Sequence, residues 1–127
     1  MKKLLSALIV ICFCQVANAQ LANNSWTGTV SAGGGDINAL WKLTADSSFF
    51  YSNDDNSLLD VSVITIHDST LTIKKVSGLS GCNETQVGVY TFNITDDKLK
   101  IYLVKDECDE RGEVLDKSSF IRQDAKQ

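Results

Sequence analysis

The chain has 127 residues, and its 12 lysines and arginines are outnumbered by 16 aspartates and glutamates, for a net charge of −4. A negative field repels phosphate groups, which argues against nucleic acid and anionic membranes as partners. A chain of this length makes one small domain with a modest stability margin.

Residues 1–19 have the pattern of a secretory signal peptide. A basic start precedes an apolar run over residues 4–14, and the segment ends in the small-residue sequence Ala-Asn-Ala. The apolar run is shorter than the roughly 20 residues that span a bilayer. We therefore expect cleavage near Ala19, a secreted or periplasmic domain over residues 20–127, and no stable membrane insertion.

Loss of this segment would make the domain more acidic and would leave it two cysteines. Lys2 and Lys3 leave with residues 1–19, so 10 basic and 16 acidic residues remain, a net charge of −6. Cys82 and Cys108 are the remaining cysteines, and an even count in a small exported domain predicts a disulfide. Closing a loop of 26 residues contributes about 3 kcal/mol in the chain-entropy model.

Short runs rich in β-branched and aromatic residues recur along the chain, separated by clusters of Gly, Asn, Asp and Ser. This spacing is typical of an all-β meander. The run Gly33-Gly34-Gly35 lacks the lysine that ends a phosphate loop and predicts a connection between two strands. We predict strands over residues 25–31, 39–45, 48–53, 58–67, 70–76, 86–95, 98–105 and 117–123.

The strand pattern predicts a closed barrel. In residues 98–105, Leu99, Ile101 and Leu103 alternate with lysines and a tyrosine, which indicates one buried and one solvated face. Connections are short and rich in turn formers, as in hairpins. Eight such strands close most economically into a single antiparallel up-and-down barrel, because closure removes exposed edges; a two-sheet sandwich is the alternative. The acidic segment 106–116 is the best candidate for one turn of helix.

Several motifs resemble those of small secreted lipocalin-like (calycin-type) β-barrel proteins of bacteria. They are an early Trp-Thr-Gly that includes Trp26, Cys82 before a Gly-Val-Tyr-x-Phe strand, and an Asp-x-Cys-x-x-Arg segment that ends at Arg111. The resemblance implies a lipocalin-like barrel in which Trp26 lies against Arg122 or Arg111 where the first and last strands meet. A plain core position for Trp26 is the alternative.

Arg111 lies among six carboxylates in residues 104–117. We expect it to hold an ion pair with Asp106 or a neighbouring carboxylate, or to close the barrel over Trp26. In either case we expect Arg111 to have a structural role.

No catalytic, metal or cofactor site is predicted. His67 is the single histidine, beside a turn, and no Gly-x-Ser-x-Gly elbow is present. An EF-hand aligned on Gly112 fails, because Arg111 and Ser118 stand where oxygen ligands and a glutamate are needed. One histidine and a cysteine pair leave no tetrahedral zinc set.

An eight-stranded barrel has room for its own side chains or for one small ligand. We expect a secreted, non-enzymatic barrel that binds a small hydrophobic ligand; a fully packed core is the alternative interior. The alternative function is a secreted protein-binding module, such as an enzyme inhibitor, with a protein partner at the acidic and glycine-rich loops. An isomerase- or cyclase-like enzyme rests on analogy of fold alone. The predicted ligand-binding residues are Trp41, Phe50, Val61, Val63, Phe92 and Ile101.

Overall fold

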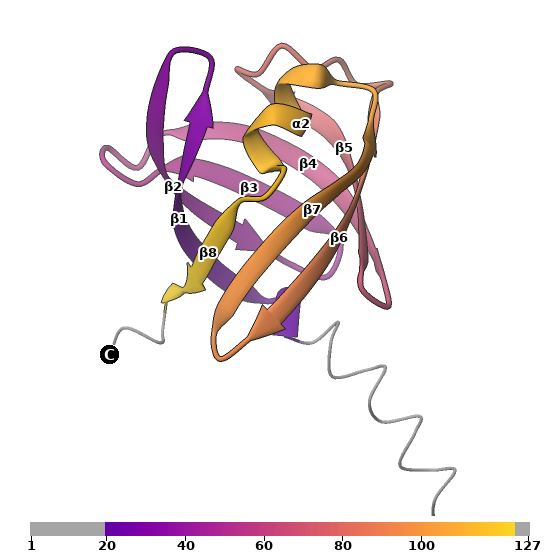
Figure 1. Cartoon of the computed structure of the whole chain (residues 1–127). Coiled ribbons are helices and arrows are strands. Elements are labelled where there is room, and N and C mark those ends of the chain that lie inside the picture. The colour runs from indigo at the N-terminus through magenta and orange to yellow at the C-terminus, as the bar shows by residue number, and fades with distance from the viewer. Residues whose placement is uncertain (1–19, 124–127) are drawn as a thin grey trace, which may run out of the picture.

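The computed structural model describes residues 20–123, which form a closed antiparallel barrel of eight strands in up-and-down order (Figure 1). The predicted fold is confirmed, and so is the disulfide between Cys82 and Cys108. The sandwich alternative is wrong because the first and last strands pair with each other. The predicted signal peptide, residues 1–19, lies outside the described residues.

Each strand pairs with the next one along the chain, so every connection is local. The two-residue turns use backbone conformations that Gly and Asp tolerate: Gly33 and Gly34 have φ values of 38° and 124°, and Asp96 and Asp97 of 50° and 65°. Within residues 20–123, no helix is long and apolar enough to span a membrane. The elements are β1 (Asn24–Ala32), β2 (Gly35–Leu43), β3 (Ser47–Ser52), β4 (Leu58–His67), β5 (Thr70–Gly78), β6 (Val87–Thr95), β7 (Lys98–Asp106), α2 (Asp109–Leu115) and β8 (Ser119–Arg122).

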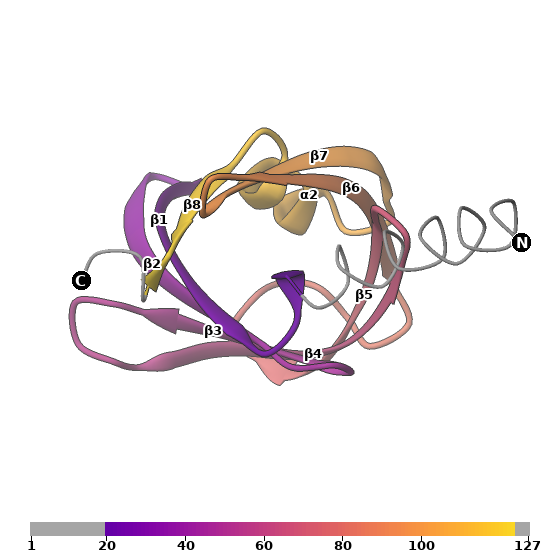
Figure 2. The ribbon, with the colours of Figure 1, turned by 90° about the horizontal axis from the view of Figure 1, so that it is seen from below.

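One end of the barrel is closed by side chains from the two ends of the described chain. Leu21 and Trp26 are fully buried, and the indole Nε1 of Trp26 donates a hydrogen bond to the carbonyl of Leu21 over 3.3 Å. The short segment before β1 lies across this opening (Figure 2). Arg122 on β8 pairs with Trp26 in register and places its guanidinium carbon 5.6 Å from the ring centroid. Of the two arginines expected to lie against Trp26, Arg122 makes the contact.

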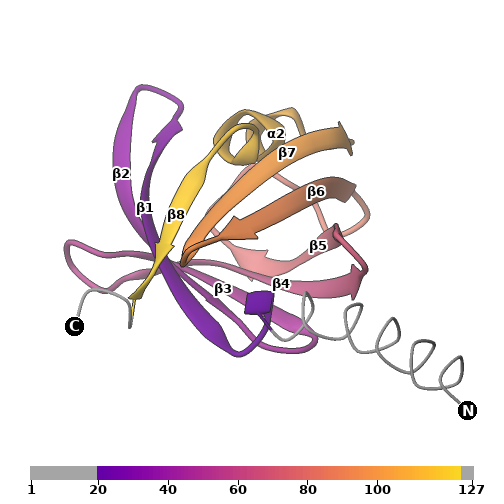
Figure 3. The ribbon, with the colours of Figure 1, turned by 60° about the horizontal axis from the view of Figure 1, so that its bottom comes forward.

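The opposite end carries α2, which contacts β7 and β1 (Figures 1 and 3). This helix has seven residues and is longer than the single turn predicted for residues 106–116. Leu99 and Ile101 on β7 are buried as expected, whereas Leu103, near α2, is exposed. The barrel therefore has one end plugged by apolar side chains and one end covered by a helix.

The predicted inner face of β4 is wrong. Val63 is 48% exposed, and Val61 pairs with Phe49 and is only half-buried. The buried face of β4 carries Ser62 and Ile64 instead. Apolar residues occur on both faces of this strand, so the valines alone do not identify the inner face.

Gly28 permits the close approach of β1 and β8 that closes the barrel. A Cβ atom at Gly28 would lie 2.8 Å from Cδ2 of Phe120 and closer still to the carbonyl oxygen of Ser119. Phe120 is fully buried and packs on Trp41 with ring centroids 5.3 Å apart. Any side chain at Gly28 must therefore push β8 away from the core.

We predict that Gly28→Ala lowers the free energy of unfolding by about 1–3 kcal/mol, the usual cost of overpacking a core. The matched control is Gly35→Ala, where a new Cβ meets nothing within 4 Å; we expect a change within about 0.5 kcal/mol. Urea unfolding of both variants checks this, and equal effects would contradict the role given to Gly28.

Candidate ligand-binding cavity

A cavity of about 210 Å³ lies inside the barrel at the end covered by α2. It is larger than the roughly 150 Å³ that holds benzene and smaller than the roughly 300 Å³ at which drug-sized sites begin. Leu79 lines the cavity although its side chain is 81% exposed, so the cavity meets solvent beside Leu79. The lining is mainly apolar and consists of Val30, Ala32, Ile37, Trp41, Ser48, Phe50, Leu59, Asp60, Ser62, Ile73, Leu79, Ser80, Glu110, Arg111, Val114 and Leu115.

Of the predicted ligand-binding residues, Trp41 and Phe50 line this cavity. Phe92 and Ile101 are buried in the core but do not line it, and Phe92 borders a second hollow together with Ser69 and Asn93. Val61 and Val63 are not part of the lining, because their side chains belong to the outer face of β4. The structure therefore brings only the β2 and β3 members of the predicted set together.

Two serines form a polar spot in the apolar wall. Ser48 on β3 and Ser62 on β4 stand directly opposite each other in the strand register and are 2% and 5% exposed. The Nε1 of Trp41 donates a hydrogen bond of 2.7 Å to the hydroxyl of Ser48. The Ser62 hydroxyl makes no hydrogen bond to any residue in the described range 20–123. Serine is ordinarily a surface residue. The one sequence signal for an inward Ser62 is that it shares a face of the strand with Ile64 and Ile66, because alternate residues of a strand point the same way.

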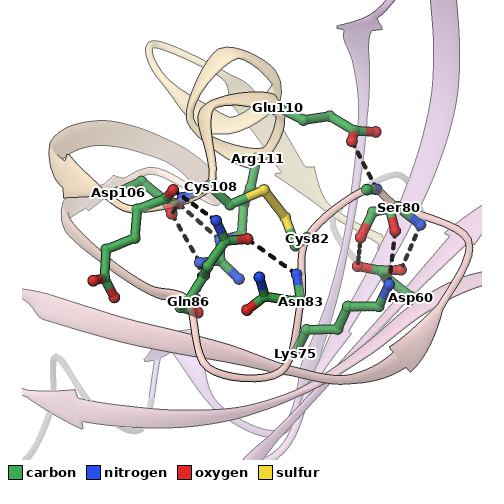
Figure 4. The surroundings of a disulfide bond; sticks show 12 residues. Asp60, Lys75, Ser80, Cys82, Asn83, Gln86, Asp106, Cys108, Glu110 and Arg111 are labelled. Atoms are coloured by element: carbon green, nitrogen blue, oxygen red, sulfur yellow. Dashed lines mark hydrogen bonds and ion pairs between the residues drawn. A yellow bond between two sulfur atoms is a disulfide. The ribbon is translucent and has the colours of Figure 1, made fainter.

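The cavity is covered by α2 together with residues 79–86, which we call the cover. The disulfide joins Cys82, in residues 79–86, to Cys108, the residue directly before α2 (Figure 4). The amide of Gly81 donates to a carboxylate oxygen of Glu110 at the start of α2 over 2.7 Å. Covalent and polar bonds therefore hold the two parts of the cover to each other.

The cover is also tied to the barrel wall. Asp60 on β4 accepts hydrogen bonds from the amide and hydroxyl of Ser80, at 3.2 and 2.7 Å. Lys75 on β5 donates to the carbonyl of Ser80 over 2.7 Å (Figure 4). Since these bonds lie close to Leu79, the edge of the cover next to the opening is held by polar contacts.

Asp106, at the end of β7, fixes α2 in place. The Nε and Nη2 of Arg111 donate to the two carboxylate oxygens of Asp106 at 2.7 and 2.8 Å, and the Cys108 amide donates over 2.8 Å. The buried Tyr90 hydroxyl donates to the same carboxylate. Arg111 is 8% exposed, and its Nη2 also donates to the carbonyl of Gln86. The expected Arg111–Asp106 ion pair is present and joins α2 to β7, and the hydrogen bond from Tyr90 adds β6.

Burial and hydrogen bonding act in opposite directions on the pKa of Asp106. Burial alone raises this pKa, but the hydrogen bonds from Arg111, Tyr90 and the Cys108 amide outweigh burial and hold it below the usual value. For Tyr90, burial and the hydrogen bond to Asp106 both raise the pKa. Asp106 is therefore an anion and Tyr90 a neutral donor at neutral pH.

No cluster of three or more metal-ligating side chains occurs within residues 20–123. His67 lies beside the β4–β5 turn, where its ring is 3.5 Å from Asp68 and largely exposed to solvent. It is not part of the cavity lining. The polar groups available to a molecule in the cavity are therefore those of the serines, Asp60, Glu110 and Arg111.

By its architecture the chain is a small, disulfide-bonded, antiparallel β-barrel, consistent with a calycin-like fold. Comparisons of the chain with protein-family models, with curated proteins and with solved structures found no match.

We predict that Asp106 makes stability depend on acid pH. A lowered pKa means that its contribution is complete above the unfolded-state value, near 3.8, and is lost as the pH falls through the folded value. Asp106→Asn should lower the free energy of unfolding by about 3 kcal/mol at neutral pH, because the buried Arg111 loses its counter-ion. The gap between wild type and variant should shrink below about pH 4.

Urea unfolding at a series of pH values checks this prediction. The control is Asp109→Asn, because Asp109 is exposed and makes no ion pair among the described residues. It should follow the wild-type curve. A gap between wild type and Asp106→Asn that is the same at every pH would contradict the assignment.

We also predict that the double change Cys82→Ala and Cys108→Ala lowers the free energy of unfolding by about 3 kcal/mol, since this bond alone closes the loop between them in the unfolded chain. Chemical denaturation of the variant and of reduced wild type should give the same loss. If the variant unfolds at the same denaturant concentration as the oxidised protein, the bond has no stabilising role.

Proposed function

We propose that this protein is a secreted or periplasmic, non-enzymatic, lipocalin-like carrier that binds a small hydrophobic ligand in the cavity beneath the cover. The observation that carries the proposal is the cavity itself: about 210 Å³ within the barrel, with a mainly apolar wall that includes Trp41 and Phe50. Sites for small molecules are concave and apolar, with a few placed polar groups.

The closed end supports the lipocalin-like part of the proposal. The resemblance in sequence leads to the expectation that Trp26 meets an arginine of the last strand, and Arg122 occupies that position. One plugged end and one covered end with a cavity is the arrangement that a carrier needs, because the ligand can enter from one side only.

The bonding of the charged groups around the cavity supports a binding role rather than a chemical one. Arg111 is paired with Asp106. Asp60 and Glu110 accept hydrogen bonds from residues 79–86 of the cover. General acids and bases need a pKa near the working pH and reach to a substrate proton. The disulfide supports an oxidising compartment, in agreement with the expected export.

One observation favours the second candidate, a protein-binding module. Leu58 and Leu79 are both exposed next to the opening, where the amide of Leu79 donates to the carbonyl of Leu59 over 2.8 Å. The β1–β2 hairpin also rises beside the covered end (Figure 3). A partner that covers this rim would bury apolar surface, whereas a carrier uses the same rim as an entrance.

Binding of naphthalene to the purified domain, residues 20–127, followed by NMR shifts of backbone amides, tests the carrier proposal. Naphthalene suits a cavity slightly larger than one that holds benzene. We expect shifts at cavity positions such as Val30 and Ile73, and none near Leu21 at the plugged end.

The variant Ser62→Leu fills the cavity from its wall and should weaken naphthalene binding at least tenfold while keeping or raising the melting temperature. The matched control is Ser77→Leu, the same change at an exposed position of β5, and it should bind as wild type does. Absence of binding to wild type, or binding that Ser62→Leu leaves intact, would count against the carrier.

A further inference from the structure

We infer that the cavity selects an uncharged molecule with one hydrogen-bonding oxygen, and that Ser48 and Ser62 bind this oxygen. The inference rests on the proposed function and narrows it to a ligand class. It is carried by the serine pair, the bonding of Trp41, and the signs of the charges around the cavity.

The serine pair presents unused hydrogen-bonding capacity. The hydroxyl of Ser48 accepts from Trp41 and keeps its own O–H to donate. The hydroxyl of Ser62 neither donates nor accepts a hydrogen bond among residues 20–123. Side chains directly opposite on neighbouring strands have Cβ atoms about 5 Å apart. One ligand oxygen between Ser48 and Ser62 can therefore accept from one hydroxyl and, if it is an alcohol, donate to the other.

The Ser62 hydroxyl faces a cavity that meets solvent, so its hydrogen-bond partner is whatever fills the cavity, water or ligand. The neighbours of Ser62 in the lining include Phe50 and Ile73, which cannot supply one. A ligand oxygen replaces the water at this hydroxyl, whereas a hydrocarbon that displaces the water leaves the hydroxyl without a hydrogen bond. This difference makes the serine pair a site of recognition.

The charges around the cavity disfavour an anion. Asp60 and Glu110 are two carboxylates in the lining, and the one guanidinium there, of Arg111, is already neutralised by Asp106. The whole chain is also negative, at −4. A carboxylate ligand would lose its hydration without gaining a free cation, so the cavity should reject fatty-acid-like molecules.

A cationic amine is less suited than a neutral oxygen. Both carboxylates already accept hydrogen bonds from the cover, Asp60 from Ser80 and Glu110 from Gly81. An amine at the serine pair would meet two hydroxyls, and the nearest carboxylate along β4, that of Asp60, is already bonded to Ser80. Hydroxyl groups alone do not offset the loss of hydration of a buried ammonium.

Four compounds that share a phenylethyl skeleton or its close analogue separate these ligand classes: 2-phenylethanol, ethylbenzene, phenylacetate and 2-phenylethylamine. We expect calorimetry or NMR titration of the domain at neutral pH to show that 2-phenylethanol binds about fivefold more tightly than ethylbenzene, the factor that one net hydrogen bond gives. Phenylacetate and 2-phenylethylamine should each bind at least tenfold more weakly than the alcohol.

The variant Ser62→Ala should bring the ratio of the alcohol and ethylbenzene affinities close to one, and Ser62→Thr, which keeps a hydroxyl, should restore it. Ser77→Ala, the same change outside the cavity, should leave the ratio unchanged. Ser62 is the variable position because Ser48→Ala would also deprive the buried Trp41 of its hydrogen bond.

The outcomes separate the inference from the proposed function. If ethylbenzene binds as tightly as the alcohol, or Ser62→Ala keeps the fivefold ratio, the cavity binds ligands but the serine pair does not recognise them. Tightest binding by phenylacetate or by 2-phenylethylamine would overturn the choice of an uncharged ligand. If none of the four compounds binds, both the inference and the carrier function are wrong.

Discussion

The carboxylate of Asp106 is the point on which the covered end of the barrel depends. It accepts hydrogen bonds from the Arg111 guanidinium, the Cys108 amide and the Tyr90 hydroxyl, so one side chain joins β6, β7 and α2. Gly88 is required beside it, because a Cβ there would lie 2.8 Å from the Asp106 carboxyl carbon. Since α2 contributes four residues to the cavity wall, the position of this helix determines the shape of the cavity. The network is polar and buried, and such networks specify one arrangement when every member is bonded.

The two ends of the barrel are held by different kinds of interaction. The plugged end relies on apolar packing around Trp26, with one cation–π contact from Arg122. The covered end relies on a disulfide, an ion pair and hydrogen bonds that converge on residues 79–86 and α2. Apolar packing has many neighbours and no single bond that can be broken to release it. Local opening should therefore occur at the covered end, where few polar bonds beside Leu79 separate the cavity from solvent.

The strands, the barrel and the disulfide could be predicted from the sequence because each leaves a local signal: alternation, turn residues, and two cysteines in a domain that the sequence predicts to be exported. The inner face of β4 could not, since apolar residues stand on both faces and only pairing with β3 decides which face is inside. The same ambiguity concealed Ser62. Trp41 and Phe50 could be predicted because large aromatic side chains are mostly buried, whereas the contributions of α2 and Leu79 depend on how the cover folds over the barrel. Tertiary arrangement of this kind is not encoded in any short window of residues.

The two tryptophans stand directly opposite each other on β1 and β2, but their side chains have different surroundings. Trp41 belongs to the cavity wall and donates to Ser48, while Trp26 packs beneath Arg122 at the plugged end. The chain has no other tryptophan. The protein thus contains two fluorescent side chains that report on different events. The fluorescence of Trp41 responds to a molecule in the cavity, and the fluorescence of Trp26 responds to separation of the first and last strands. Each can be read with the other replaced by phenylalanine, without attaching any label.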